Sequence, residues 1–312
     1  MTDVLAICTR DRATDLTSCL HALQRCHDLP QTVLVVDSSR DEASAEVVAG
    51  IELPAGCTLT YIRSAPGLTR QRNVALDACA ASDEVIFFVD DDCHPLPGYF
   101  DALREVYDAH PDCAGVGSEV IKCDRAGAWR PVQRTNGTRL RRSVRETIER
   151  VSGKAAPDGE LSESGFNGAL TRRGQRYSPV GVQWLSGCAM SFRTSLATKV
   201  RFNETHFTGY GLGEDVEFCL RIGRYGALLL SPDTVMPHAA SPVNRLDPRT
   251  LARMQVLNTR YLVEHHPDRF SIAAFRRSLV GLAAIHTGLG SWHGVAGVLD
   301  GIRAGRVAGN DS

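Results

Sequence analysis

The sequence predicts an α/β protein in which a mixed sheet is flanked by helices and followed by a helical C-terminal region. Short apolar runs alternate with segments of helical periodicity through the first half of the chain, and the chain beyond about residue 248 has the pattern of amphipathic helices. Strands that alternate with helices indicate right-handed crossovers and parallel pairing. A length of 312 residues suffices for one large domain or two small ones.

The composition is that of an ordinary globular protein without an overall basic field. The net charge of −1 gives no reason to expect nucleic acid as a partner. The start MTDVLAICTRDR lacks the features of a signal peptide, and no apolar run approaches the roughly 20 residues of a spanning helix. The ten cysteines form no C-x-x-C pair, which favours buried thiols in a reducing compartment. We therefore expect a cytoplasmic protein.

Four strands and three helices are predicted in the first 90 residues. The strands are residues 4–9, 32–36, 59–62 and 85–89. The first helix is expected to be capped by Thr14 or Asp15. Its apolar face consists of Leu16, Cys19, Leu20 and Leu23. Two further helices are expected, one from about residue 41 and one over residues 68–80.

The stretch EVIFFVDDDCHPLPGYF, residues 84–100, is the centre of the pattern. Five apolar residues run directly into Asp90, Asp91 and Asp92, as expected for a buried central strand that ends in carboxylates. In open α/β sheets, ligands bind beyond the carboxyl ends of the strands. Adjacent carboxylates repel each other, so we expect a divalent cation carrying a phosphorylated ligand. A solvated acidic turn is the alternative, and zinc at Cys93 and His94 fits less well because no thiolate set accompanies them.

The glycine-rich fingerprints of other nucleotide-binding folds are absent. The first strand is followed by CTRDRATD, with no G-x-G-x-x-G, and no G-x-x-x-x-G-K-[ST] occurs in the chain. The first absence argues against a dinucleotide-binding Rossmann domain, and the second excludes P-loop enzymes. Any nucleotide must be held by side chains and a metal.

The second half contains three further features. Gly187 lies within an apolar segment, which predicts a close backbone approach near a site. A helix is expected to start at about Glu214 after a glycine-rich loop, and a buried strand over 227–230 precedes His238. Residues 139–150 are a basic piece that can form a helix. The helical pieces after about Pro248 have basic edges, which predicts packing against the main domain or a second copy, or contact with a membrane surface.

Taken together, these motifs resemble the inverting glycosyltransferases of family 2, which have the GT-A fold. The resemblance covers about residues 3–240. It rests on Thr9-Arg10-Asp11, Asp37 after VV, GLTRQRN from Gly67 to Asn73, the three aspartates as a form of the DxD motif, GED from Gly213 to Asp215, and His238. It implies a metal-dependent hexosyltransferase that uses a nucleoside-diphosphate sugar and a hydroxyl acceptor, in polysaccharide, glycolipid or natural-product biosynthesis.

The resemblance also implies a role for each matching residue. Thr9, Asp11, Asp37, Arg72, Asn73, Asp90 and Asp91 would bind the nucleotide. Asp90, Asp92 and His238 would hold Mn²⁺ or Mg²⁺, and Asp215 would be the catalytic base. Residues 1–120 would form the donor-binding half, residues 121–240 the acceptor-binding half with the catalytic loop, and residues 241–312 a helical extension. The membrane contact would then lie at the cytoplasmic face.

Three alternatives belong to other classes. A haloacid-dehalogenase-like magnesium phosphatase expects D-x-D-x-[TV], but His94 stands where that motif has its last residue. A nucleotidyltransferase expects a glycine-rich, lysine-containing loop after the first strand, and this chain has none. A non-catalytic partner subunit with the same fold remains open.

Overall fold

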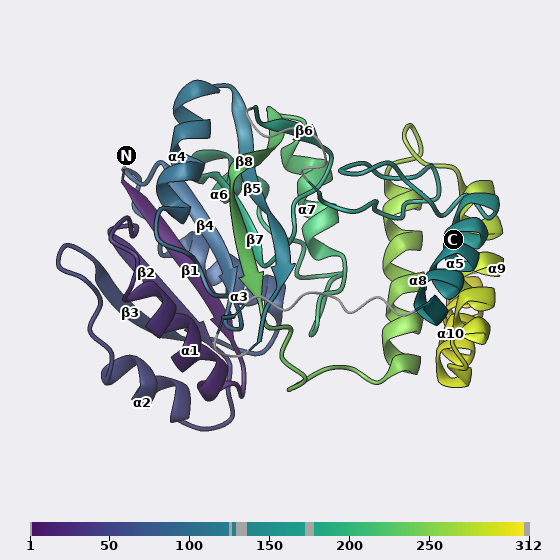
Figure 1. Cartoon of the computed structure of the whole chain (residues 1–312), viewed down its shortest axis with the longest axis horizontal. Coiled ribbons are helices and arrows are strands. Elements are labelled where there is room, and N and C mark those ends of the chain that lie inside the picture. The colour runs from purple at the N-terminus through teal and green to yellow at the C-terminus, as the bar shows by residue number, and fades with distance from the viewer. Residues whose placement is uncertain (1, 125–126, 129–135, 172–177, 309–312) are drawn as a thin grey trace. The chain divides into compact units, whose positions relative to one another are not determined.

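The structure is a computed structural model that describes residues 2–124, 127–128, 136–171 and 178–308 (Figure 1). The chain divides into two compact units. The sheet unit comprises Met1–Pro131 and Leu170–Asn244, and the helical unit comprises Val132–Ala169 and Arg245–Ser312. The segment 132–169 therefore groups with the C-terminal helices. The functional boundaries expected near residues 120 and 240 stay a prediction.

The sheet unit is built on a mixed sheet of eight strands among the described residues, in the order β3-β2-β1-β4-β7-β5-β8-β6. The strands are β1 (Asp3–Thr9), β2 (Thr32–Asp37), β3 (Thr58–Arg63), β4 (Val85–Asp90), β5 (Cys113–Lys122), β6 (Val180–Val182), β7 (Ala189–Arg193) and β8 (Ala227–His238). Strands β1 to β4 pair in parallel, as predicted, whereas β7 runs antiparallel to both β4 and β5. The predicted mixed α/β fold is confirmed.

The helices of the sheet unit pack on both faces of the sheet. They are α1 (Ala13–Leu23), α2 (Ala43–Ala49), α3 (Leu68–Asp77), α4 (Tyr99–Ala109), α6 (Thr194–Val200) and α7 (Glu214–Ile222). Adjacent side chains of β4 separate the two core layers: Phe87 packs into one cluster and Phe88 into the other, and each is 1% exposed. The central strand is therefore buried on both faces, as its continuous apolar run predicts.

The start of α1 differs from the prediction. The predicted apolar face is fully buried, but the helix begins at Ala13 and its N-cap is Arg12, with no side-chain capping bond. Asp15 lies in the first turn instead, where its Oδ2 accepts a hydrogen bond from Ser241 Oγ at 2.6 Å. The expected cap was wrong because the helix starts before Thr14 and Asp15, which both lie inside its first turn, and Asp15 is bonded to a segment more than 220 positions away.

The helical unit consists of α5 (Asn136–Val151), α8 (Pro248–His265), α9 (Ile272–Gly288) and α10 (Trp292–Ala308). The expected helix start at Pro248 is confirmed: Asp247 is the N-cap and its Oδ1 accepts from the backbone N–H groups of Arg249 and Thr250. Within the part of the chain that the structure describes, no helix combines the length and apolar character needed to cross a bilayer.

Candidate active site

The strand register brings the predicted site residues of the sheet unit to one edge. Thr9 pairs with Asp37, Asp37 pairs with Arg63, and Cys8 pairs with Asp90, so the carboxyl ends of β1 to β4 lie in line. Because β7 is antiparallel to β4, the loop before it reaches the same edge. This is the edge where ligands bind in open α/β sheets.

The three consecutive aspartates have three different environments. The side chain of Asp90 is 34% exposed, and its nearest ionic partner is Arg72, whose Nη2 lies 3.7 Å from Oδ1. Asp91 is buried, and its two oxygens accept from Thr9 Oγ1 at 2.7 Å and from Arg12 Nη1 at 3.0 Å. Burial raises the pKa of Asp91 to about 7, although Arg12 and Thr9 oppose the shift. Asp91 therefore points into the fold and Asp90 points out of it.

Asp92 forms a pair with His238. Oδ1 of Asp92 lies 3.0 Å from Nε2 of His238, and Oδ2 accepts from the Ser241 N–H at 2.7 Å. Burial opposes ionisation of both groups, but their close pairing lowers the pKa of Asp92 and raises that of His238, to which the Cys188 thiol beside Nδ1 also contributes. Ligand atoms of Asp92, Cys93 and His238 lie within 4.8 Å of one another, close enough to share one metal ion. Two of the three expected ligands are thus together, whereas Asp90 is not part of this group and Cys93 is.

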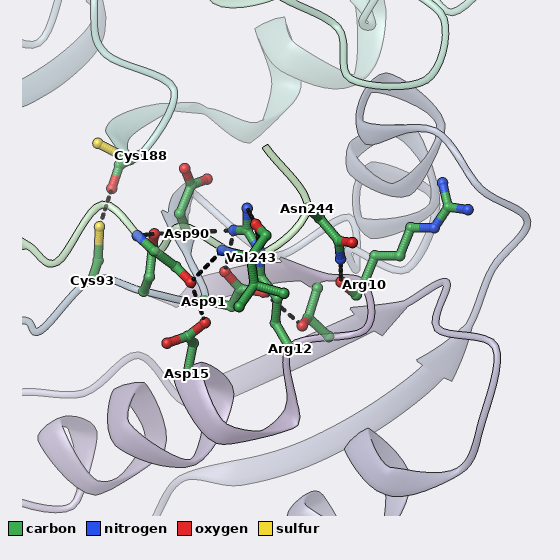
Figure 2. A network of polar contacts seen from close by, with 12 residues as sticks. Arg10, Arg12, Asp15, Asp90, Asp91, Cys93, Cys188, Val243 and Asn244 are labelled. Atoms are coloured by element: carbon green, nitrogen blue, oxygen red, sulfur yellow. Dashed lines mark hydrogen bonds and ion pairs between the residues drawn. The ribbon is translucent and has the colours of Figure 1, made fainter. Parts of the chain in front are cut away.

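The segment after His238 crosses the start of α1 (Figure 2). Arg12 reaches both sides of this crossing, because Nη1 bonds Asp91 while Nη2 donates to the Val243 carbonyl at 2.8 Å. Asn244 Nδ2 donates to the Arg10 carbonyl at 2.6 Å, and Ser241 bonds Asp15 as described. Sequence reasoning missed Arg12 and Ser241; the place of Arg12 beside Asp11 in TRDR was the one signal for it.

Arg72 is a buried cation on the other side of Asp90. It is 2% exposed, forms an ion pair with Glu214, and donates from Nη2 to the Gly187 carbonyl at 2.9 Å. Its guanidinium lies 5.8 Å from the ring centroid of Phe88 and 5.3 Å from that of Phe202. A Cβ at Gly187 would lie 2.9 Å from Nη2, which confirms the predicted close backbone approach. Burial raises the pKa of Glu214 to about 8 although Arg72 opposes the shift.

Asp215 follows Glu214 in the first turn of α7. The N-cap of this helix, Gly213, has φ of 81°, a left-handed conformation that favours glycine. The half-buried Asp215 accepts from the Gly187 N–H at 2.9 Å through Oδ2, and from its neighbour's N–H through Oδ1. Burial raises the pKa of Asp215. Gly187 therefore contacts both Arg72 and Asp215.

The nucleoside candidates lie at the ends of β1 and β2 or within α3. Asp11 accepts from the backbone and side chain of Arg40 at 2.8 and 3.0 Å. The amide of Asn73 is used by the fold, because Nδ2 donates to the Phe202 carbonyl and Oδ1 accepts from its N–H, each at 2.9 Å. Sequence reasoning also missed Gln71, whose Nε2 donates to the Thr9 and Val36 carbonyls and joins β1 to β2.

The family model described as Glycosyl transferase family 2 matches residues 4–167, more than half of the 312. This chain belongs to glycosyl transferase family 2. The match confirms the predicted family and, with it, the predicted enzyme class. No curated protein matches the chain.

Solved structures resemble this glycosyltransferase in fold. GalNAc-T7, solved with UDP, GalNAc and Mn²⁺, is 13% identical with a TM-score of 0.57, over 86% of this chain and 51% of that one. The mannosyltransferase PcManGT from Pyrobaculum calidifontis, solved with GDP-Man and Mn²⁺, is 15% identical with a TM-score of 0.52, over 98% and 75%. S. aureus TarS 1-349 is 16% identical with a TM-score of 0.50, over 98% and 92%. This chain thus spans about half of the GalNAc-T7 chain, and the predicted GT-A fold is confirmed.

Proposed function

We propose that this chain transfers a sugar from a nucleoside-diphosphate sugar to an acceptor hydroxyl, with inversion and with Mn²⁺ or Mg²⁺. The observation that carries the proposal is the juxtaposition at one sheet edge of a partly exposed acid, a carboxylate–imidazole pair and a second half-buried acid. Arg72 connects two of these acids. Its Nη2 lies 3.7 Å from Oδ1 of Asp90, and its guanidinium is ion-paired with Glu214, the residue before Asp215. The family match and the nucleotide complexes of similar folds support the same reading.

The expected metal ligands suit a divalent cation that binds both carboxylate oxygen and imidazole nitrogen. Carboxylate oxygens from Asp90 and Asp92 with one imidazole from His238 are ligands that suit Mn²⁺ or Mg²⁺, and the imidazole favours Mn²⁺. When bound, such an ion neutralises the charge that develops on the leaving diphosphate. His238 would have to be neutral to serve as a ligand, so Asp92 and His238 would each turn from the other to the cation on binding it. Asp91, held by Thr9 and Arg12, keeps the two ligating acids in place.

Asp215 is the proposed base. The Gly187 N–H fixes one of its oxygens, and the carboxylate retains acceptor capacity for an acceptor hydroxyl. A pKa raised by burial makes the carboxylate a stronger base. In-line attack opposite the diphosphate gives inversion. The nucleoside would then lie at the ends of the strands that carry Thr9, Asp11 and Asp37, with Arg72 and Asn73 shaping the pocket through the backbone that they hold.

Binding of nucleotide tests this proposal directly. We expect one nucleoside diphosphate to raise the melting temperature only when Mn²⁺ is present, because a ligand that binds the folded state stabilises it. Asp92→Ala should remove this shift, whereas Asp101→Ala, which removes an exposed acid on α4, should keep it. An unchanged shift in Asp92→Ala would rule out the cation site.

We also propose that the helical unit contacts an anionic membrane surface at the cytoplasmic face. Of the eleven large apolar side chains exposed among the described residues, eight belong to this unit, and the most exposed are Val151 at 76%, Val280 at 72% and Trp292 at 70%. Its 16 basic and 10 acidic residues give a charge of +6, against −7 for the sheet unit. Apolar side chains on a basic unit suit interfacial binding.

Vesicle co-sedimentation tests the membrane contact. We expect binding to vesicles with anionic lipid and not to neutral ones, with clear loss in Trp292→Ser. Tyr225→Ser removes a side chain that is 49% exposed in the sheet unit and should bind normally. Concentration-dependent dimerisation without vesicle binding would instead assign the surface to a second copy of the chain.

A further inference from the structure

The Asp37 carboxylate is already occupied by the protein. Its Oδ1 accepts from the N–H and Oγ of Ser39 at 2.8 and 2.5 Å. Its Oδ2 accepts from Tyr61 Oη at 2.8 Å and from Arg63 Nη1 at 3.3 Å. An ionised carboxylate offers about four acceptor positions, so these four donors use its capacity. Because Asp37 is also 0% exposed, a nucleoside must displace one of these donors to reach it.

Arg63 is the accessible member of this network. It pairs with Asp37 across β2 and β3, and its side chain is 41% exposed. Nη1 also donates to the Asp41 carbonyl at 3.0 Å and Nη2 to the Ser39 carbonyl at 2.6 Å, which fixes the plane of the guanidinium. Among the described residues, no acceptor is paired with Nε or with the second Nη2 hydrogen. The group is thus a rigid, partly exposed fork with donors to spare.

A second observation at the same strand end points to a ligand. Ser38 is 3% exposed, and its Oγ has no hydrogen-bond partner among the described residues. Its own N–H donates to the Thr9 carbonyl at 3.1 Å, so the residue is held between β1 and β2. A buried hydroxyl without a partner is costly, and a bound molecule at this position removes that cost.

We infer that Arg63 determines the choice of nucleobase by donating hydrogen bonds to a ring carbonyl, and that Asp37 positions Arg63 rather than binding the nucleoside. The inference rests on the proposed function, because it assumes that this edge of the sheet binds a nucleotide. A guanidinium has donors and no acceptor. It therefore favours a base that presents a carbonyl and rejects one that presents an amino group at the same position.

Two matched pairs of nucleotides isolate this contact. Uracil presents a carbonyl at position 4 where cytosine has an amino group, and guanine has O6 where adenine has an amino group. With Mn²⁺, we expect the wild type to bind UDP at least about tenfold more tightly than CDP, or GDP more tightly than ADP by the same factor. Calorimetry measures both ratios, and inorganic pyrophosphate serves as a probe that has no base.

Arg63→Lys keeps a positive charge beside Asp37 but loses the planar fork. We expect this variant to lose the discrimination within the pair while its affinity for pyrophosphate with Mn²⁺ stays unchanged. Asp37→Asn should lose discrimination as well, because it weakens the anchor of Arg63. Arg40→Lys changes a neighbouring arginine, 79% exposed and paired with Asp11, and should retain the wild-type ratio.

The outcomes separate the two proposals. A wild type that does not discriminate within either pair, or an Arg63→Lys variant that keeps the full ratio, overturns the role of Arg63 and leaves the transferase proposal intact. An equal loss of pyrophosphate affinity in Arg63→Lys likewise overturns it, since the effect would then come from the fold and not from the base. A wild type that binds neither nucleotides nor pyrophosphate with Mn²⁺ overturns both proposals.

Discussion

Asp37 and Asp91 differ from Asp90 and Asp215, although all four lie near the same edge of the sheet. Both oxygens of Asp37 and of Asp91 accept hydrogen bonds from buried or anchored donors. The Asp90 carboxylate accepts no hydrogen bond within the described residues and is 34% exposed, and Asp215 accepts from two backbone N–H groups, those of Gly187 and Val216, with no side-chain donor described. A buried carboxylate needs partners, so the first two stabilise the site and the second two are available to ligands.

The largest effect on activity should come from Asp215, the acid that is available to ligands and has a proposed role in the reaction. Asp215→Asn removes the proposed base but keeps a similar shape, so we expect transfer to fall by about 10²–10⁴-fold. Donor binding should stay intact, because the base acts only as the acceptor loses its proton. Steady-state turnover and calorimetry with the donor nucleotide measure the two quantities separately.

Glu217→Gln is the matched control for Asp215→Asn. It removes a carboxylate from the same helix, where Glu217 pairs with Arg221. We expect its turnover to match the wild type once any loss of folded protein is corrected. Normal turnover by Asp215→Asn would place the base elsewhere.

The next largest effect contrasts two adjacent residues. Asp91→Ala removes the acceptor of the Thr9 hydroxyl and of Arg12 Nη1 and leaves the mostly buried Arg12 with the Val243 carbonyl, so we expect the free energy of unfolding to drop by about 3 kcal/mol. Asp90→Ala removes no hydrogen bond that the described structure contains and should leave stability nearly unchanged while abolishing Mn²⁺-dependent nucleotide binding. Urea unfolding and calorimetry on both variants measure this difference. Equal stability losses would erase the distinction between the two acids.

The positions of the acids at the strand ends were predictable from the sequence, because they depend on the order of residues within a short segment. An apolar run followed by Asp90 places this acid at the carboxyl end of its strand. The glycines before Glu214 predict a tight turn into a helix. The register then aligns residues of neighbouring parallel strands without further information. This is why the predicted residues of the sheet unit converge on one edge.

The partners of those acids were not predictable, because they come from distant positions. Arg12 and Asp91 are 79 positions apart, and Ser241 lies 149 positions from Asp92. No sequence periodicity relates such pairs. The sequence therefore does not distinguish an aspartate whose carboxylate is hydrogen-bonded within the fold from one that is available to a ligand. Asp37 is the clearest case: its sequence context suggests a nucleoside ligand, whereas Tyr61 and Arg63 occupy it in the fold. Helix α4 and strand β5 were not assigned either, because the Pro- and Gly-rich turn before them obscures where the helix begins.

The smallest effect concerns Glu214, which is buried beside Asp215. Unlike Asp215, it is paired with a side chain of the protein, that of Arg72, and so resembles Asp37 and Asp91. Its pKa is raised by burial from 4.5 to about 8, so the folded state binds the proton more tightly than the unfolded chain. Its contribution to stability is therefore fully present below about pH 4.5 and is lost as the pH rises to about 8.

Glu214→Gln keeps a hydrogen-bond acceptor for Arg72 and cannot ionise. We expect its unfolding midpoint in urea to change less between pH 5 and pH 8 than that of the wild type, while Glu217→Gln retains the wild-type slope. Parallel pH profiles for the wild type and Glu214→Gln would show that Glu214 is already ionised against Arg72 throughout this range.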